Sequence, residues 1–349
     1  MTISFKHFLM TEAGNFQRQA LNPDQFMNIL KQQCQGWINA VKSKHVIPIW
    51  RGDSNHKGAL SMGDSNSFTR SAANTASWYM IWIDGSEKWE DFPKRSKAYI
   101  CTNDSATAEG YGEIQVVIPY DTAHIGVVPA DDMWFGFRNQ LFRFFGSREI
   151  ETVESFQDYV RSCAKLVNHP ISGTNITQLH SDLSDITLER MQSVINNVKT
   201  AVNSFEPGMF EKLFGRNISF SSIMDTIKTG SDYKQLDKII RDAWPGEHPS
   251  PITNFWSDYQ SSQVIMTAMR KNNLDSLAQV FDVIFTPDSF TYMKGADINR
   301  LSNDEQREYW VQGPCLFIAC DDTDGATISD LYKRMFKELE INMHKLTGY

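Results

Sequence analysis

The chain changes character near its middle, and this change limits the folds that it can adopt. From about residue 46 to 130, short apolar runs alternate with Gly, Ser, Asn and Asp, a pattern typical of strands separated by loops. From about 151 to 280, apolar residues recur at helical spacing instead. The clearest run contains Leu188, Met191, Val194, Ile195, Val198 and Val202. The sequence therefore predicts an α+β fold in which strands and helices are largely segregated.

Individual strands and helices are expected at particular places along the chain. A helix is predicted to begin at Asn22 and Pro23, because asparagine is a good N-cap residue and proline suits the first helical position. Apolar residues from 26 to 41 then share one helical face, and a last helix is predicted from Ser329. Strands are predicted at 46–50, 98–101, 114–118, 125–128, 280–285 and 315–320.

These patterns divide the chain into four parts. Residues 1–20 are interpreted as a targeting-like segment and 21–150 as a β-rich core. Residues 151–280 form either a helical insertion or a second, helical domain, and 281–349 return to strands before a C-terminal helix. Three prolines between residues 244 and 251 predict a hinge within the helical part, because proline interrupts helices.

Composition and charge argue against several classes of function. The net charge of −8 disfavours nucleic-acid binding, for which a basic turn containing Lys94, Arg95 and Lys97 would be the footprint. No apolar run approaches the ~20 residues of a membrane span, so no membrane partner is expected. The five scattered cysteines form neither a disulfide framework nor a metal-binding motif, which favours a reducing compartment without a bound metal. No secretory signal is expected at the N-terminus.

Two segments of the β-rich core carry residues suited to binding a polar ligand. Arg51 follows an apolar run, where its planar guanidinium could enter a cleft, and Gly52 would let a ligand approach the backbone. Further on, Ser96 and Tyr99 lead into a strand that ends at Thr102, whose hydroxyl group could orient a ligand. The alternatives are a surface arginine at a strand end and an ordinary solvated basic turn before a strand.

Paired carboxylates provide the candidate catalytic groups. Asp131 and Asp132 follow the predicted strand 125–128 and could stabilise a cationic transition state. They could equally cap the next helix, because aspartate is favoured at helix N-termini. Glu149 and Glu151 offer a second pair, with the spacing Glu-x-Glu, in what is predicted to be helical sequence.

The order of these features resembles the mono-ADP-ribosyltransferase family of the Arg–Ser–Glu type. An aromatic-Arg-Gly strand precedes a strand that ends in hydroxyl residues, which precedes Ala-x-x-Tyr-Gly, further strands and carboxylates. The resemblance covers residues 46–134. It implies a split antiparallel β core, NAD as the substrate, and a host protein as the acceptor of ADP-ribose.

The resemblance also implies a role for each candidate residue. Arg51 would hold the phosphates of NAD, and Trp50 or Tyr99 would stack on one of its rings. Thr102 would stand in the Ser-Thr-Ser segment that shapes the nicotinamide pocket, and Asp131 or Asp132 would supply the catalytic carboxylate. The chain departs from the family pattern in two places, because it reads Cys-Thr-Asn in place of Ser-Thr-Ser and has no Glu-x-Glu directly after residue 128.

The N-terminal segment carries a second resemblance. Residues 4–13, Ser-Phe-Lys-His-Phe-Leu-Met-Thr-Glu-Ala, are similar to the capsid-targeting peptide of internal head proteins of T4-like phages. This resemblance implies cleavage after Glu12, packaging in the phage head and delivery to the host cytoplasm. The alternative to a targeting peptide is a short amphipathic N-terminal segment.

Two functional hypotheses follow from these resemblances. The first is a phage-type mono-ADP-ribosyltransferase that is packaged in the virion and modifies a host macromolecule. The second is a virion or host-takeover interaction protein that uses a similar α+β scaffold without chemistry. The acceptor residue, the host target and the oligomeric state are left open by the sequence.

Overall fold

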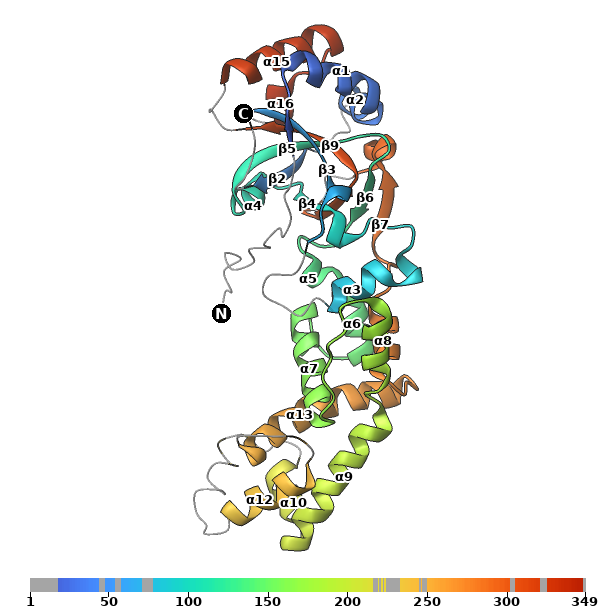
Figure 1. Cartoon of the computed structure of the whole chain (residues 1–349), viewed down its shortest axis with the longest axis vertical. Helices are drawn as coiled ribbons and strands as arrows, with labels where there is room; N and C mark the ends of the chain where they lie inside the picture. Colours follow the sequence, from blue (N-terminus) through green and yellow to red (C-terminus); the bar gives the residue numbers. More distant parts are fainter. Residues whose placement is uncertain are drawn as a thin grey trace. The chain divides into compact units, whose positions relative to one another are not determined.

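The computed structural model of the chain contains two compact units (Figure 1). It describes residues 18–43, 48–53, 58–70, 78–215, 219, 221, 223, 233–244, 246, 250–301, 305–320 and 325–347. The sheet unit comprises Met1–Gly136 and Thr286–Tyr349, and the helical unit comprises Phe137–Phe285. The chain leaves the sheet unit after strand β6 (His124–Val127) and returns before strand β7 (Thr291–Lys294), and these two strands pair directly. The helical unit is therefore an insertion, one of the two arrangements that the sequence left open.

The strands of the sheet unit confirm the α+β class. Among the described residues they form one nine-stranded sheet in which every pairing is antiparallel. Strands β2 and β4 are joined by a single register pair, Trp50 opposite Thr102. The order across the sheet is β1 (Gln19–Ala20), β3 (Leu60–Asp64), β9 (Pro314–Ala319), β5 (Glu113–Pro119), β2 (Ile49–Asp53), β4 (Tyr99–Thr102), β8 (Glu308–Gln312), β6 and β7.

The sheet is strongly bent. Tyr99 on β4 and Phe317 on β9 are three strand positions apart, which corresponds to about 14 Å in a flat sheet. Their ring centroids are nevertheless only 5.1 Å apart, so the sheet curves between β9 and β4 and brings these two strands toward each other on this side. We call the side that carries Tyr99 and Phe317 the inner face. The opposite side, which carries Thr102, is the outer face.

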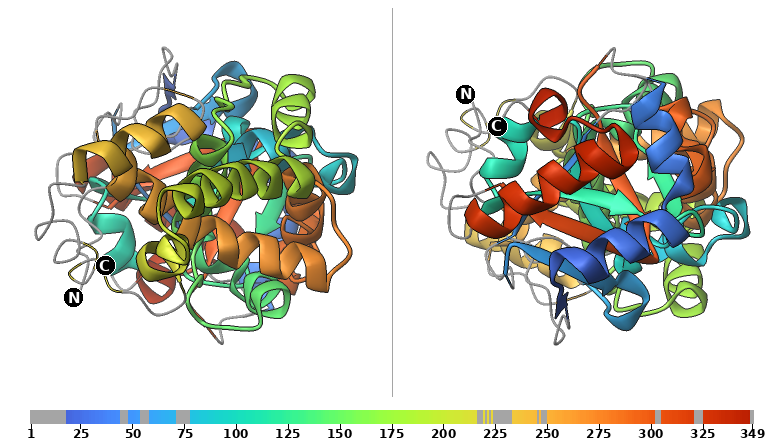
Figure 2. Two further views of the ribbon diagram at one scale, coloured as in Figure 1. Left: turned by 90° about the horizontal axis from the view of Figure 1, so that it is seen from below. Right: turned by 90° about the horizontal axis from the view of Figure 1, so that it is seen from above.

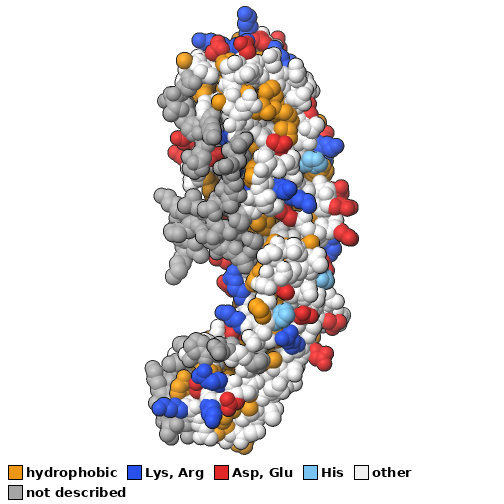
Figure 3. Space-filling view, viewed as in Figure 1, with side chains coloured by type: hydrophobic (Ala, Val, Ile, Leu, Met, Phe, Trp, Pro, Cys, Tyr) orange, Lys and Arg blue, Asp and Glu red, His pale blue; other side chains and the backbone are white. Residues whose placement is uncertain are grey.

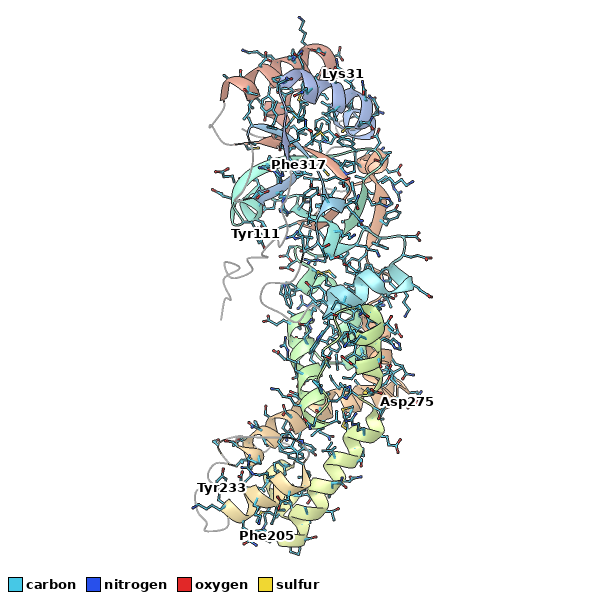
Figure 4. All side chains as sticks on the ribbon, viewed as in Figure 1. Lys31, Tyr111, Phe205, Tyr233, Asp275 and Phe317 are labelled. Carbon is cyan, nitrogen blue, oxygen red and sulfur yellow. The ribbon has the colours of Figure 1, made fainter. Side chains whose placement is uncertain are left out.

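Helices from the two ends of the chain pack together on the sheet unit. They are α1 (Pro23–Gln33), α2 (Gln35–Lys42), α15 (Gly325–Leu339) and α16 (Met343–Thr347). Figure 2 shows α1 and α15 beside each other over the strands, and Lys31, labelled in Figure 4, forms an ion pair with Glu338 across this contact. The predicted cap is confirmed, since the Asn22 side chain accepts from the backbone N–H of Gln25 at 2.9 Å. The helix ends earlier than expected, because the backbone leaves helical geometry at Cys34.

Several short helices lie where the sequence predicted only strands and loops. The longest is α3 (Trp78–Gly85), in which most side chains are buried. A continuous apolar run such as this one has no helical period and is compatible with either helix or strand. The others are η2 (Ser65–Ser67), η3 (Glu87–Trp89), η4 (Arg95–Lys97), α4 (Ser105–Glu109), α5 (Met133–Gly136) and η5 (Gly295–Arg300).

The helical unit corrects one predicted strand. Residues 280–285 were expected to be extended, but they belong to α14 (Leu277–Ile284) and its C-cap. The reason is local, because Ser276 and Gln279 form a reciprocal capping box that starts a helix just before the apolar run. The unit also contains α6 (Arg138–Phe145), α7 (Val153–Leu166), α8 (Ile176–Ser184), α9 (Leu188–Phe205), α10 (Met209–Phe214), α12 (Tyr233–Ala243) and α13 (Pro251–Lys271).

The predicted helix at 188–202 is confirmed as α9, whose apolar stripe is buried. The predicted hinge falls partly outside the described residues, which omit 245 and 247–249. Within the described part of the chain, no helix has both the length and the apolar character that crossing a membrane requires.

The bend in the sheet gives a first prediction. Phe317→Ala should lower the free energy of unfolding by about 3–5 kcal/mol, because the ring fills the space between β9 and β4 on the inner face. The matched control is Phe336→Ala on α15, whose side chain is 62% exposed and whose loss should cost within about 0.5 kcal/mol. Urea unfolding of both variants measures the difference. Equal effects would mean that Phe317 does not hold the bend.

Candidate functional site

Arg51 belongs to a buried network on the inner face. Its Nη1 donates to the carbonyl oxygen of Ile100 at 3.1 Å, and its Nε lies 3.9 Å from Oδ2 of Asp53. Arg18 donates to the same carboxylate oxygen at 2.7 Å, and the Arg51 guanidinium lies 5.7 Å from the ring centre of Tyr99. The structure thus gives Arg51 a role in tying β2 to β4.

Thr102 points to the other side of the sheet. It lies opposite Trp50 on β2 and opposite Glu308 on β8, so these three side chains share the outer face. Arg51, one residue beyond Trp50, must point to the inner face, because successive side chains of a strand alternate. The structure therefore does not bring Arg51 and Thr102 to one site. The Thr102 hydroxyl oxygen accepts from the backbone N–H of Asp104 at 3.1 Å.

Gly52 is needed by the packing of the chain itself. A Cβ atom at this position would lie 2.0 Å from the carbonyl oxygen of Ala108 and 2.9 Å from Cβ of Tyr111. Helix α4 and the residues after it therefore occupy the space beside Gly52, where the sequence predicted that a ligand could approach the backbone. Tyr111 itself is 39% exposed.

This contact predicts the effect of adding a methyl group to Gly52. Gly52→Ala should lower the free energy of unfolding by about 2 kcal/mol, because β2 or α4 has to move. Gly325→Ala is the control, since nothing lies within 4 Å of its Cβ position and its stability should be unchanged or slightly raised. Thermal unfolding of both variants tests this, and a Gly52→Ala protein as stable as the control would contradict it.

Ser96 and Tyr99 have structural partners. The backbone N–H of Ser96 donates to the Asp84 carboxylate at 3.0 Å, and burial raises the pKa of Asp84 while these hydrogen bonds oppose the rise. The ring of Tyr99 is fully buried between Phe68, at 5.6 Å, and Phe317. Tyr99 lies on the inner face, on the opposite side of the sheet from Thr102.

Of the two adjacent aspartates, Asp132 enters a buried cluster on the outer face. Only 7% of Asp132 is exposed, and its Oδ1 accepts from the backbone N–H of Trp134 at 2.8 Å, at the start of α5. The capping role that the sequence left open is thus present. Asp131 is exposed.

Glu149 and Glu151 lie in the other unit. They occupy the loop between α6 and α7, not a helix as predicted, and Glu151 pairs with Arg138 at 2.8 Å. The spacing Glu-x-Glu therefore has no structural connection to Thr102 within the sheet unit.

Glu308 is the carboxylate that the structure places opposite Thr102, and the sequence analysis missed it. Its Oε1 accepts from Arg95 Nη2 at 3.0 Å and from the indole N–H of Trp310 at 2.6 Å. Its Oε2 accepts from the backbone N–H of Met133 at 3.2 Å. The sequence does contain a signal that could have identified Glu308. Gln306-Arg307-Glu308 has the same spacing as a Glu-x-Glu segment and stands at the start of a run of strand-forming residues. We call Glu308, Asp132, Arg95, Tyr79, Trp310 and Tyr111 the Glu308 cluster.

Arg95 corrects the expectation of a solvated basic turn. It is 4% exposed, and its Nη1 also donates to the hydroxyl oxygen of Tyr79 at 3.3 Å. Burial lowers the pKa of Arg95, but Tyr79, Glu308 and Asp132 raise it more strongly, so the guanidinium stays charged. A buried arginine within a basic sequence could not be recognised, because its partner Glu308 is 213 residues away.

The two carboxylates of the cluster have unequal environments. Burial, followed by the charge of Glu308, raises the pKa of Asp132 to about 7, while the hydrogen bond from Trp134 and the charge of Arg95 act in the opposite direction. Burial, followed by the charges of Asp132 and Glu308, raises the pKa of Tyr111 to about 12. Tyr111, labelled in Figure 4, therefore lies within electrostatic reach of both carboxylates at an exposed edge of the sheet unit.

The raised pKa predicts how stability depends on pH. The folded protein holds the Asp132 proton more tightly than the unfolded chain, whose aspartates titrate near ~3.9. Wild-type stability should therefore fall as pH rises from about 4 to about 7, and Asp132→Asn should remove this fall. At pH 8 the variant should be more stable than wild type by at least about 1 kcal/mol, and at pH 4 it should not be. Equal pH dependence in both proteins would contradict the buried, protonated state.

Comparison of the chain with models of known protein families, with curated proteins and with solved structures gave no match. Among the described residues, no group of three or more His, Cys, Asp and Glu side chains is placed to hold a metal ion.

Proposed function

We propose that this chain is a mono-ADP-ribosyltransferase that cleaves NAD and transfers ADP-ribose to a host macromolecule, with Glu308 as the catalytic carboxylate. The observation that carries the proposal is the register of three neighbouring strands. Trp50 on β2, Thr102 on β4 and Glu308 on β8 lie side by side on the outer face. This is the order of arginine strand, hydroxyl strand and carboxylate that the family resemblance implies.

The local sequence around Glu308 adds support. Gln306-Arg307-Glu308 has the spacing of the Glu-x-Glu segment, with an amide in place of the first carboxylate. The Gln306 amide nitrogen donates to the hydroxyl group of Thr107 at 2.7 Å, so the residues before β8 are held against α4. Glu308 replaces Asp131 and Asp132 as the proposed carboxylate because it lies directly opposite the hydroxyl residue.

The environment of Glu308 suits the proposed chemistry. Departure of nicotinamide leaves a ribosyl cation of the oxocarbenium type, which a fixed negative charge stabilises. Arg95 and Trp310 hold the Glu308 carboxylate in place before the reaction, so little reorganisation is needed. Because the carboxylate is 7% exposed, its charge is poorly screened by water.

Tyr111 is the proposed contact for a ring of NAD. It is an exposed aromatic side chain within electrostatic reach of Glu308 and Asp132, and an aromatic face can stack on a planar ring. The proposal does not depend on Arg51, whose guanidinium lies on the inner face. Trp50 and Tyr99 are buried and serve the packing of the sheet.

The biological setting of the proposal comes from the N-terminal resemblance alone. Residues 4–13 and the expected cleavage site at Glu12 lie outside the described residues. Packaging in the virion and action on a protein of the host cytoplasm are therefore proposed from the peptide resemblance. Figure 3 shows acidic and basic side chains interspersed on the visible described surface, and the net charge is −8. Both observations fit a protein target better than nucleic acid.

One observation favours the alternative of a non-enzymatic interaction protein. Glu308 and Arg95 already satisfy each other in a buried ion pair, which is also how structural ion pairs are built. In that case the cluster would only hold β8 against η4 and α5, and the scaffold would serve binding.

The test separates the two functions. Purified protein incubated with labelled NAD and a host-cell lysate should transfer label to lysate proteins and release nicotinamide. Glu308→Gln should lower nicotinamide release by at least about 100-fold, because a fixed charge at the cation is lost. Glu305→Gln is the matched control, since this carboxylate is exposed and three residues earlier, and its activity should match wild type.

Binding is measured alongside turnover. NAD should raise the melting temperature of wild type and of Glu308→Gln by similar amounts, because the carboxylate acts on the transition state. Wild-type protein that neither releases nicotinamide nor gains stability from NAD would overturn the proposal in favour of the interaction protein.

A further inference from the structure

The two buried carboxylates of the Glu308 cluster are joined through adjacent backbone amides. The N–H of Met133 donates to Glu308, and the next N–H, of Trp134, donates to Asp132. Both carboxylates thus meet at the start of α5.

Glu308 accepts more hydrogen bonds than Asp132 does. Glu308 accepts from a guanidinium, an indole and a backbone amide, which together hold its carboxylate in place. For Asp132 the described residues provide one backbone amide. The nearby charge of Glu308 opposes the ionisation of Asp132, so burial and this charge together raise the pKa of Asp132 above its ordinary value.

The charged groups of the described residues that act on Asp132 have opposing effects on its ionisation. Glu308 from β8 and Asp131 from its own segment oppose its ionisation, and Arg95 from η4 favours it. The hydroxyl groups of Tyr79 on α3 and Tyr111 after α4 feel the charge of Asp132, and both stay protonated because their pKa values are raised. The balance leaves Asp132 with a pKa of about 7.

We propose that Asp132 is the general base of this site and that Glu308 is the electrostatic partner of the ribosyl cation. The inference rests on the proposed function and deepens it by giving each of the two carboxylates a separate role in the reaction. Paired groups whose environments separate their proton affinities are typical of acid–base sites. A base that titrates near the working pH is also the most effective one.

The proposed step is balanced as follows. The bond between C1′ of the ribose and the nicotinamide nitrogen breaks, and its electron pair leaves with neutral nicotinamide. A bond forms between C1′ and the attacking atom of the acceptor, which is water in the absence of a macromolecule. The proton of that atom passes to the Asp132 oxygen that does not face Trp134. No oxidant, reductant or metal takes part.

The acceptor class follows from this assignment. A base that titrates near neutral pH is useful only to a nucleophile that loses a proton as it attacks, such as a hydroxyl or amide group or water. The reaction should therefore slow below the ionisation of Asp132 for hydrolysis and for transfer alike.

The experiment is a pH profile of NAD hydrolysis. Between pH 5 and 7, kcat/KM of the wild type should rise nearly tenfold per pH unit and then level off, because only the ionised base reacts. Asp132→Asn should lose this rise and fall at least tenfold below wild type at pH 8, while NAD still raises its melting temperature. Asp91→Asn, an exposed carboxylate outside the cluster, should keep the wild-type profile.

A second readout does not depend on turnover. The Asp132 carboxyl carbon, followed by NMR as the signal absent from Asp132→Asn, should titrate near pH 7 in wild type. In Glu308→Gln it should titrate at lower pH, because the opposing charge is gone.

The outcomes separate the two proposals. An Asp132→Asn enzyme that keeps the rising limb, or an Asp132 signal that titrates near its ordinary value, overturns the assignment of the base and leaves the transferase standing. Wild-type protein that hydrolyses no NAD at any pH overturns both.

Discussion

The single register pair between β2 and β4 is the constraint on which the sheet unit depends. With only Trp50 opposite Thr102, the sheet can bend there until Tyr99 of β4 meets Phe317 of β9. The same pair decides the direction of every neighbouring side chain, because strand residues alternate between faces. Arg51 is thereby assigned to the inner face and Thr102 to the outer face. A shift of this pairing by one residue would place Arg51 and Thr102 on the same face.

The buried ion pair between Arg95 and Glu308 joins two segments that are distant in the sequence into one site. Arg95 and Glu308 are far apart in the chain, but neither charge could be buried without the other, since an isolated ion away from water is costly. Their ion pair holds β8 against η4, and it places Asp132 beside a second negative charge. The unusual proton affinity of Asp132 is therefore a consequence of how the fold brings β8 to the residues before α5.

Much of the fold could be predicted from local sequence. The cap at Asn22 and the apolar stripe of α9 depend on residues within a few turns, and both are present as expected. The strand predicted at 280–285 was wrong, because a capping box outside the apolar run starts a helix. For the site, the sequence pointed to the strand of Thr102 and to Asp132. It did not identify Glu308, because a single glutamate at a strand start carries no local signal of burial.

The sequence by itself determined the α+β class, the separation of a strand-rich part from a helical part, and the residue types available for chemistry. These properties follow from spacing and composition, which act over short distances along the chain. Only the tertiary structure decided that the helical unit is inserted between two paired strands, which face each candidate occupies, and which carboxylate lies opposite Thr102. These properties depend on strand register and on pairs such as Arg95 with Glu308, for which proximity in space has no counterpart in the local sequence.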